Sequence, residues 1–269
     1  MPAGRAPRAS ACHNPARPCR PRALFPPLLP AVTSLYREIK RQLIADIANG
    51  VVAPGAALPN ETDLARRFNV SIGTLRRAVD ELVADHILVR QQGRGTFVGL
   101  QDRDRFMFQF FRIEGRDGLR EFPQLSMQNF AKGRATPAEA RQLGLSGTPS
   151  VFRIENVLTL QGQPVIFDRI VISAQLYGGL TQAQFEQRKG TIYELYQTDF
   201  GITIVDADER VRIEPADAQS AQHLGLAEGD AVLHIERVAH TVDGQVAEFR
   251  ISTVNTQTHD YVVRARGKR

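Results

Sequence analysis

A cluster of small polar and cationic residues in the first third of the chain has the composition of a nucleic-acid-binding surface. It consists of Ser71, Gly73, Thr74, Arg76 and Arg77. Hydroxyl groups and free backbone N–H groups bind phosphates, and an arginine can also donate two parallel hydrogen bonds to a guanine edge. Ser71 has the residue type that caps a helix, and the free N–H groups at a helix start favour a nearby anion. The cluster therefore predicts a DNA-binding surface at the start of a helix.

The other residues that could carry chemistry do not form a catalytic or metal-binding pattern. Cys12, His13 and Cys19 lack the further ligand that completes a tetrahedral zinc site. His234 and His240 lie on one predicted hairpin, without a third ligand close in sequence. We predict no catalytic residue, no metal and no cofactor.

A helix starting after Ser71 would present the polar cluster on its outer face. At ~100° per residue, Gly73, Thr74 and Arg77 point away from the apolar stripe and Arg76 lies at its flank. The predicted apolar stripe consists of Ile72, Leu75, Ala78, Val79 and Leu82. Such a stripe is also typical of an ordinary surface helix, so the neighbouring elements decide between the two interpretations.

Two further helices precede this one. The first is predicted from apolar residues at four-residue spacing, Leu35, Ile39, Leu43 and Ile47, and ends at Asn49-Gly50. Asn60 has the residue type of a cap for a short second helix, and Asp63 follows at the capping-box distance. Asn69-Val70 leaves only a tight turn before the third helix. Helices joined in this way form a helix-turn-helix, in which the last helix reads the DNA.

A hairpin follows the third helix. Its strands are predicted at Ile87 to Arg90 and Thr96 to Val98, around the tip Gln91-Gln92-Gly93-Arg94-Gly95. A cationic hairpin next to a helix-turn-helix is typical of a winged helix-turn-helix domain.

This segment closely resembles the DNA-binding domain of the GntR family of bacterial transcription regulators. The resemblance rests on Leu58-Pro59-x-Glu61-x-x-Leu64-Ala65, Val70-Ser71, Thr74-Leu75-Arg76-Arg77-Ala78, Leu82 and Gln92-Gly93-Arg94-Gly95-Thr96-Phe97-Val98. It implies that Ser71 and Arg76 contact DNA, and that Gly93 to Gly95 run along or into the minor groove. Thr62 and Ile72 stand where many members carry arginine, so the family's common operator does not transfer directly.

The DNA contacts are predicted to fall into two classes. Arg37, Arg41, Arg66 and Arg94 would contact phosphates, which supplies salt-dependent affinity without reading sequence. Gly73, Thr74, Arg76 and Arg77 would contact base edges, because they lie on the exposed first half of the reading helix.

The rest of the chain predicts an antiparallel sheet with helices, which makes the fold class α+β. A charged connector at 102–105 leads into a predicted β-like run from Phe106 to Ile113. Further strands are predicted at 126–130, 151–160, 164–173, 202–213, 231–242 and 245–255, and helices at 137–143, 191–200 and 215–224. Gly162-Gln163 and Asp243-Gly244 predict hairpin turns.

Two segments of this region are similar to each other. Each places a short helix, a Leu-Gly-Leu turn and a strand pair in the same order, starting at Thr136 and at Glu214. Residues 105–262 resemble the UTRA effector domain of the HutC subgroup, which implies a chorismate-lyase-like fold. The motifs are Leu143-Gly144-Leu145, Gly162-x-Pro164, Ile192-Tyr193-x-Leu195-Tyr196 to Phe200-Gly201, Leu224-Gly225-Leu226 and Ala247-Glu248.

The UTRA resemblance also implies an effector site. It places Asp168, Thr191 and Glu248 in the effector cavity, and strand alternation adds Arg250 on the same face as Glu248. Arg112 is a further candidate from the first strand region. Each of these residues also fits a solvent-facing charge or a structural ion pair.

Asn156 and Leu158 occupy positions where sugar-phosphate sensors of this subgroup tend to carry arginine. Without those arginines a phosphate loses its main partners. We therefore expect a small, polar, non-phosphorylated effector, such as an organic acid or an amino-acid derivative.

Four segments are predicted along the chain. They are a disordered Arg/Pro/Ala-rich tail at 1–33, the winged helix-turn-helix at 34–99, the effector domain at 100–262 and a basic tail at 263–269. The tail alternatively reflects an incorrectly assigned start codon. Its five arginines account for the net charge of +5, because residues 34–269 carry 29 basic and 29 acidic residues. Both cysteines lie in the tail and no apolar run is long enough to span a membrane, which indicates a cytoplasmic protein.

Together these features predict a homodimeric transcription regulator, most often a repressor in such families, that binds an inverted-repeat operator in double-stranded DNA. Binding of an effector to its second domain would shift the dimer between DNA-competent and incompetent states. The alternative is an enzyme with a lyase-like domain fused to a DNA-binding module.

Overall fold

The structure is a computed structural model that describes residues 35–264, with the side chain of Phe108 left out. The predicted tail at 1–33, with Cys12, His13 and Cys19, lies outside these residues, as do residues 265–269. No helix within residues 35–264 is both long enough and apolar enough to cross a membrane.

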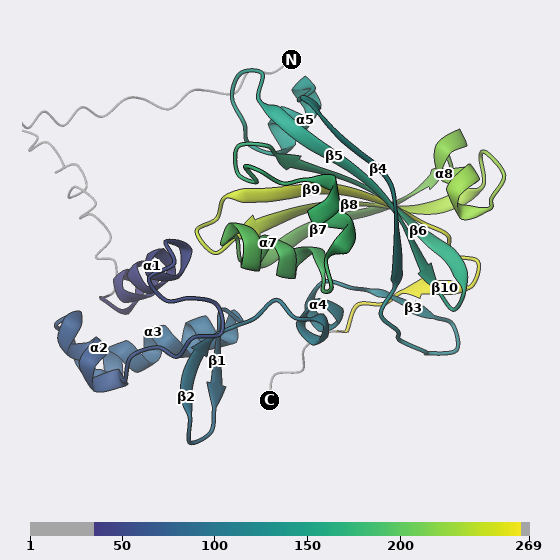
Figure 1. Ribbon diagram of the computed structural model, residues 1–269. Coiled ribbons are helices and arrows are strands. Elements are labelled where there is room, and N and C mark those ends of the chain that lie inside the picture. The colour runs from purple at the N-terminus through teal and green to yellow at the C-terminus, as the bar shows by residue number, and fades with distance from the viewer. Residues whose placement is uncertain (1–34, 265–269) are drawn as a thin grey trace, which may run out of the picture. The chain divides into compact units, whose positions relative to one another are not determined.

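The first part of the described chain contains three helices and a hairpin (Figure 1). They are α1 (Leu35–Ala48), α2 (Glu61–Arg67), α3 (Ile72–Ala84), β1 (Leu88–Gln91) and β2 (Gly95–Val98). The predicted apolar residues Ile39, Leu43 and Leu75 are buried, and β1 and β2 pair antiparallel. The winged helix-turn-helix prediction is therefore confirmed.

Both predicted helix caps are present in this domain. The Asn60 side chain accepts a hydrogen bond from the Asp63 N–H at the start of α2, and Ser71 accepts one from the Thr74 N–H at the start of α3. The prediction that Ile72 belongs to the buried stripe is wrong, since its side chain is 40% exposed. Ile72 is the first residue of α3, where the helix has not yet reached the core formed by Leu75, Ala78 and Leu82.

The predicted β-like run from Phe106 to Ile113 is also wrong over most of its length. Residues Arg103–Gln109 form helix α4, which starts at the cap Asp102, and only β3 (Ile113–Gly115) is extended. Phe106 and Phe110 lie about one helical turn apart and are both buried. Capping and burial of these aromatic residues outweigh their preference for strands.

The second part of the chain is built on a six-stranded antiparallel sheet (Figure 1). Its strands, in spatial order, are β4 (Gln124–Arg134), β5 (Ser150–Leu160), β6 (Gln163–Ser173), β9 (Val246–Val254), β8 (Ala231–Thr241) and β7 (Ile204–Pro215). A separate two-stranded pairing joins β3 to β10 (His259–Tyr261). The α+β prediction with an antiparallel sheet is confirmed.

The sheet consists of two similar halves. In each half a long edge strand is followed by a short helix and a hairpin: β4, α5 (Pro137–Gln142), β5 and β6, then β7, α8 (Ala218–Leu224), β8 and β9. The halves meet where β6 pairs with β9, with an approximate twofold axis at the Arg169 and Ile251 pair. The similarity of the two segments in sequence therefore reflects a structural duplication.

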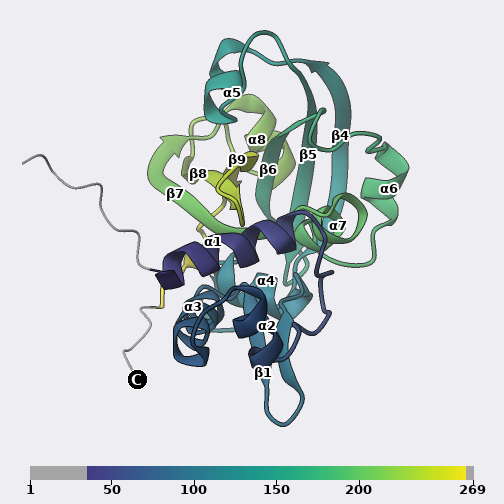
Figure 2. The same cartoon turned by 90° about the vertical axis from the view of Figure 1, so that its left-hand side faces the viewer.

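Helices cover both faces of this sheet. Leu143, just after α5, and Leu224 of α8 pack on one face, against Val151 and Phe167 respectively. The other face is covered by α4, α6 (Gln182–Gln187) and α7 (Ile192–Phe200), whose aromatic residues join the main core. Figure 2 shows α6 and α7 next to each other, away from α5 and α8. The cavity described below lies on the α7 side.

Candidate DNA-binding surface and effector cavity

The predicted base-contacting residues lie together at the start of α3. Gly73, Arg76 and Arg77 are exposed, and Thr74 is partly exposed with its hydroxyl 2.8 Å from that of Ser71. Because Ser71 and Thr74 also cap the helix, the backbone at this end is held in place before any DNA binds.

Neighbouring side chains hold the two arginines of α3. Arg76 donates a 2.6 Å hydrogen bond from Nε to Glu61 on α2, while 61% of its side chain stays exposed. The Arg77 guanidinium stacks 4.0 Å from the centre of the Tyr36 ring. Each guanidinium is therefore oriented but retains free donors for a base or a phosphate.

The predicted phosphate contacts come from α1, α2 and the wing. Arg37 donates from Nε to the Tyr36 hydroxyl at 3.2 Å, and Arg66 pairs with Asp63 at 3.1 Å. At the wing, Gly93 and Gly95 have φ of 71° and 114°, values that favour glycine, and Arg94 lies 5.8 Å from the Phe97 ring centre. These positions remain predictions, but their placement is compatible with DNA contact.

A polar band crosses the α7-facing side of the sheet, where alternation places every second residue of each strand. Asn156 on β5 stands opposite Asp168 on β6, and Asp168 stands opposite Ser252 on β9. Arg250 and Glu248 are on the same face, two and four residues before Ser252. Since Asp168, Glu248 and Arg250 are buried, their charges must be satisfied locally.

Arg250 is the centre of this band. Its guanidinium contacts Asp168 at 3.1 Å and Glu248 at 2.8 Å, and Ser252 donates to the other Asp168 oxygen. Burial disfavours the charge of Arg250, but attraction to the two carboxylates outweighs it and raises its pKa above the usual value. Glu248 and Arg250, which strand alternation places on one face, form an ion pair, and Asp168 is the second anion of Arg250.

Glu248 is fully buried behind Arg250. The hydroxyl of Tyr196 donates to it at 2.8 Å and that of Tyr193 at 3.4 Å, and burial raises the pKa of Tyr193 to about 12. Both tyrosines therefore stay protonated donors. Glu248 does not line the cavity and acts on Arg250 from behind, so its predicted contact with an effector is indirect at most.

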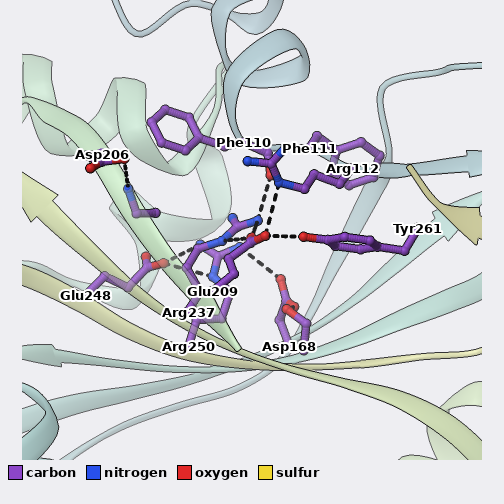
Figure 3. Close-up of polar contacts among 12 residues, drawn as sticks. Phe110, Phe111, Arg112, Asp168, Asp206, Glu209, Arg237, Glu248, Arg250 and Tyr261 are labelled. Atoms are coloured by element: carbon purple, nitrogen blue, oxygen red, sulfur yellow. Dashed lines mark hydrogen bonds and ion pairs between the residues drawn. The ribbon is translucent and has the colours of Figure 1, made fainter. Parts of the chain in front are cut away.

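Arg112 lies in a second network, outside this cavity. It contacts Glu209 at 3.0 Å, and Arg237 and the Tyr261 hydroxyl converge on the same carboxylate (Figure 3). Burial would raise the pKa of Glu209, but attraction to Arg237 and hydrogen bonds lower it overall. Arg112 therefore forms an ion pair within the protein and does not line the cavity that Asp168 and Arg250 share with Thr191.

The cavity has a volume of about 320 Å³ and lies between the sheet, α4 and the start of α7. Asp168 and Thr191, which the family resemblance places in an effector cavity, line it, and so does Arg250, which strand alternation adds. Asn156, Arg188 and Lys189 also line the cavity. From the sequence, Asn156 is noted only because related sugar-phosphate sensors carry arginine there, and Arg188 and Lys189 are not predicted. Alternation from the turn at Gln161 and Gly162 alone would place Asn156 opposite Phe167, and the bulge at Leu158 and Thr159 shifts it opposite Asp168. Neither this bulge nor the loop position of Arg188 has a signal in the sequence.

Thr191 connects the cavity to the segment that follows the wing. Its hydroxyl accepts from the Glu194 N–H at 3.0 Å and donates to the Gln101 carbonyl at 3.2 Å. Gln197, further along α7, accepts from the Gln101 N–H at 2.9 Å and donates to the Gly99 carbonyl at 3.1 Å. We call these contacts the Gln101 clamp. All three clamp side chains, those of Gln101, Thr191 and Gln197, are at least 97% buried.

Comparison with known proteins identifies both domains of the chain. Residues 35–98 match the model of the gntR family of bacterial regulatory proteins, and residues 123–260 match the UTRA domain. A probable fructoselysine utilization operon transcriptional repressor from Shigella flexneri is 28% identical, over 76% of this chain and 84% of its own length. The transcriptional repressor NagR from Bacillus subtilis is 26% identical, over 85% of this chain and 93% of its own.

Solved structures show the same fold. A ligand-binding domain from Bordetella bronchiseptica, assigned to a GntR-family regulator, has a TM-score of 0.56 and 24% identity, covering 59% of this chain and 98% of its own. YydK from Bacillus subtilis, a possible transcriptional regulator, has a TM-score of 0.53 and 19% identity, covering 86% and 100%. The chain belongs to the GntR family of DNA-binding transcription regulators and carries the UTRA domain of its HutC-type members.

Proposed function

We propose that this regulator is a homodimeric repressor that binds an inverted-repeat operator and releases it when a small, polar, non-phosphorylated metabolite occupies the cavity beside Asp168, Thr191 and Arg250. The names of its relatives support repression, because two of them are repressors of operons or of transcription. They also favour a regulator over the alternative of a lyase-like enzyme, and we propose that the cavity binds its ligand without converting it.

The Gln101 clamp is the observation that carries this proposal. Thr191 both lines the cavity and donates to the Gln101 carbonyl, so the ligand site and the segment leaving the wing share one side chain. An effector that binds better to one position of α7 shifts the equilibrium toward that position. Since Gln197 on α7 also holds Gly99 and Gln101, a shift of α7 would alter the path of this segment. Effector binding and DNA binding are thereby linked, and linkage acts equally in both directions.

The strands that form the floor of the cavity offer no unpaired cation to a phosphate, which supports a non-phosphorylated effector. Asn156 and Leu158 are neutral, and Arg250 is already neutralised by Asp168 and Glu248. A phosphate dianion on these strands would lack charge-assisted partners, so an anionic group of the effector could be held only by the cations at the rim, Arg103, Arg188 and Lys189.

A release assay tests the function. Fluorescence anisotropy of a labelled fragment from the adjoining intergenic DNA would report binding, and metabolites would then be added in turn. We expect a non-phosphorylated metabolite to raise the Kd for this DNA by tenfold or more, on the order of 1.4 kcal/mol of coupling. Release by sugar phosphates alone would contradict the assigned effector class, and turnover of the metabolite would favour the enzyme.

A further inference from the structure

Asn156 is a buried polar side chain whose amide has no partner. It is 1% exposed, and neither its Oδ1 nor its Nδ2 has a hydrogen-bond partner within residues 35–264. Buried amides in native proteins are nearly always paired, because an unpaired one costs about 1–3 kcal/mol. Asn156 also lines the cavity beside its cross-strand neighbour Asp168. A ligand group that both donates and accepts would satisfy it.

The duplication explains why Asn156 is unpaired. Arg237 occupies the equivalent position in the second half of the sheet, opposite Glu209 on the edge strand β7. Opposite Asn156, the edge strand β4 carries Met127 instead. Arg237 contacts Glu209 directly, whereas a thioether is only a weak acceptor. In the second half, Arg237 therefore has a polar partner on the edge strand. In the first half, Asn156 has none.

The rim of the cavity has a cation that lacks an anion. The Arg188 guanidinium packs 4.1 Å from the Phe185 ring centre, and its buried Nε has no hydrogen-bond partner within the described residues. Burial lowers the pKa of Arg188 to about 10, which still leaves it charged at neutral pH. Lys189, exposed beside it, and Arg103, which packs 4.1 Å from the Phe122 ring centre, add further positive charges, while Glu186 is an acid on this rim. The rim therefore favours an anionic group.

Apolar side chains form the remaining walls. They are Phe106, Phe122, Leu125, Leu158, Ile170 and Ile192. A ligand made only of hydroxyl groups would leave its polar groups unpaired against these walls, whereas an aliphatic or aromatic portion would gain from burial there.

We infer that the effector is a monocarboxylate that bears an amide or hydroxyl group and an apolar side chain, with Asn156 pairing the amide or hydroxyl and Arg188 the carboxylate. The inference rests on the proposed function for the identity of the cavity as the effector site. It narrows the effector from polar metabolites in general to acylamino and hydroxy acids with apolar side chains.

Calorimetric titration of the full chain without DNA tests this inference. The probes are N-acetyl-L-leucine, N-acetyl-L-phenylalanine and the 2-hydroxy acids with the same side chains. The comparators are the carboxamides of these probes, the plain acids 4-methylpentanoate and 3-phenylpropanoate, and glucose 6-phosphate. We expect at least one probe to bind about tenfold more tightly than its own carboxamide and its own plain acid. If no probe binds, if every probe binds no better than its comparators, or if glucose 6-phosphate binds most tightly, the inference is wrong.

Two variants assign the two roles. Arg188→Gln should remove the preference for the acid over its carboxamide, and Asn156→Leu should remove the preference for the acylamino acid over the plain acid, each by about tenfold. Asn129→Leu and Arg141→Gln, at exposed positions, serve as matched controls and should keep both preferences.

Asn156→Leu should not lower the melting temperature, because it removes an unpaired buried amide. Retention of both preferences in the Asn156 and Arg188 variants would overturn the assignment.

A separate DNA measurement distinguishes failure of the inference from failure of the proposed function. If a probe binds with the expected preferences but does not release DNA, the ligand class is supported and the proposed coupling is wrong. If sugar phosphates release DNA and the probes do not bind, the coupling stands and the ligand class is wrong.

Discussion

At the scale of single residues, Arg77 on α3 and Arg66 on α2 have different partners. Arg77 is stacked on Tyr36 and points away from the buried stripe, whereas Arg66 is paired with Asp63 at the edge of α2. Arg77 lies on the exposed first half of the reading helix, which suits recognition of a base edge, while Arg66 lies on α2, outside that helix, which suits a phosphate.

Replacing Arg77 with alanine should therefore weaken binding to the operator by about 1–3 kcal/mol and relax one operator position. Arg66→Ala should weaken binding to all DNA sequences alike and reduce the salt dependence by about one phosphate contact. Competition titrations with operator variants at several salt concentrations measure both. Equal, sequence-independent losses in the two variants would contradict this division of roles.

Glu209 should contribute to the acid sensitivity of the fold. Its pKa is lowered in the folded protein, so it stabilises the fold at pH values above its unfolded pKa of about 4.3, and this contribution is lost as pH falls through the folded pKa. Glu209→Gln should reduce the free energy of unfolding at pH 7 by about 3 kcal/mol, because Arg237 loses its anion. It should also make this free energy fall less steeply as the pH is lowered. Urea unfolding from pH 3 to pH 7 measures this, with the exposed Glu228→Gln as control. If the free energy of unfolding of Glu209→Gln still falls as steeply with decreasing pH, the acid sensitivity of the fold comes from other carboxyl groups.

At the scale of elements, α7 is both a wall of the cavity and half of the Gln101 clamp. Gln197→Met should unpair Gln101 and Gly99, cost about 1–3 kcal/mol of stability and reduce the effect of the effector on DNA affinity. Anisotropy titrations with and without effector give this coupling, and Gln187→Met on α6 is the exposed control. If the coupling in Gln197→Met equals that of the control, α7 does not transmit binding through this contact.

The duplicated sheet allows a second test at this scale. Asn156→Arg combined with Met127→Glu copies the closed pair of Arg237 and Glu209 into the first half. We expect the double variant to fold, with a melting temperature near that of the parent, and to bind effector at least tenfold more weakly. The single variant Asn156→Arg has no acid opposite it on the edge strand and must share Asp168 with Arg250, so it should be less stable than the double variant. Undiminished effector binding in a folded double variant would show that the ligand does not contact Asn156.

Elements with strong local signals could be predicted from the sequence. The cap at Ser71 and the two hairpins come from residue types and periodicity that act within a few positions. α4 could not be predicted in this way, because its aromatic residues are buried by distant parts of the chain, which outweighs their strand preference. The same applies to the candidate site: Asp168 and Arg250 follow from family motifs and alternation. Arg188 lies in the cavity only through the tertiary arrangement of its loop.

At the scale of the whole molecule, the proposed function requires two DNA-binding domains that act together. Residues 34–99 are nearly neutral, with nine basic and seven acidic residues, so one domain has little electrostatic affinity of its own. Two linked domains bind two half-sites with a raised effective concentration.

We therefore expect a homodimer whose affinity for a complete inverted repeat exceeds that for a single half-site by about 10²-fold or more. Sedimentation velocity gives the assembly state, and anisotropy with whole and half operators gives the ratio of affinities. A monomer that binds both fragments equally would contradict the proposed assembly.

The pairing of β3 with β10 affects the order in which the molecule forms during synthesis. Ile113 pairs with Tyr261 and Gly115 with His259, so the effector domain joins its first strand to its last. The three helices and hairpin of the DNA-binding domain, by contrast, are complete at Val98. Domains fold as units during translation, N-terminal ones first. A nascent chain therefore carries a finished DNA-binding domain well before its effector domain can close, and the proposed control by a metabolite would begin only when the final strand leaves the ribosome.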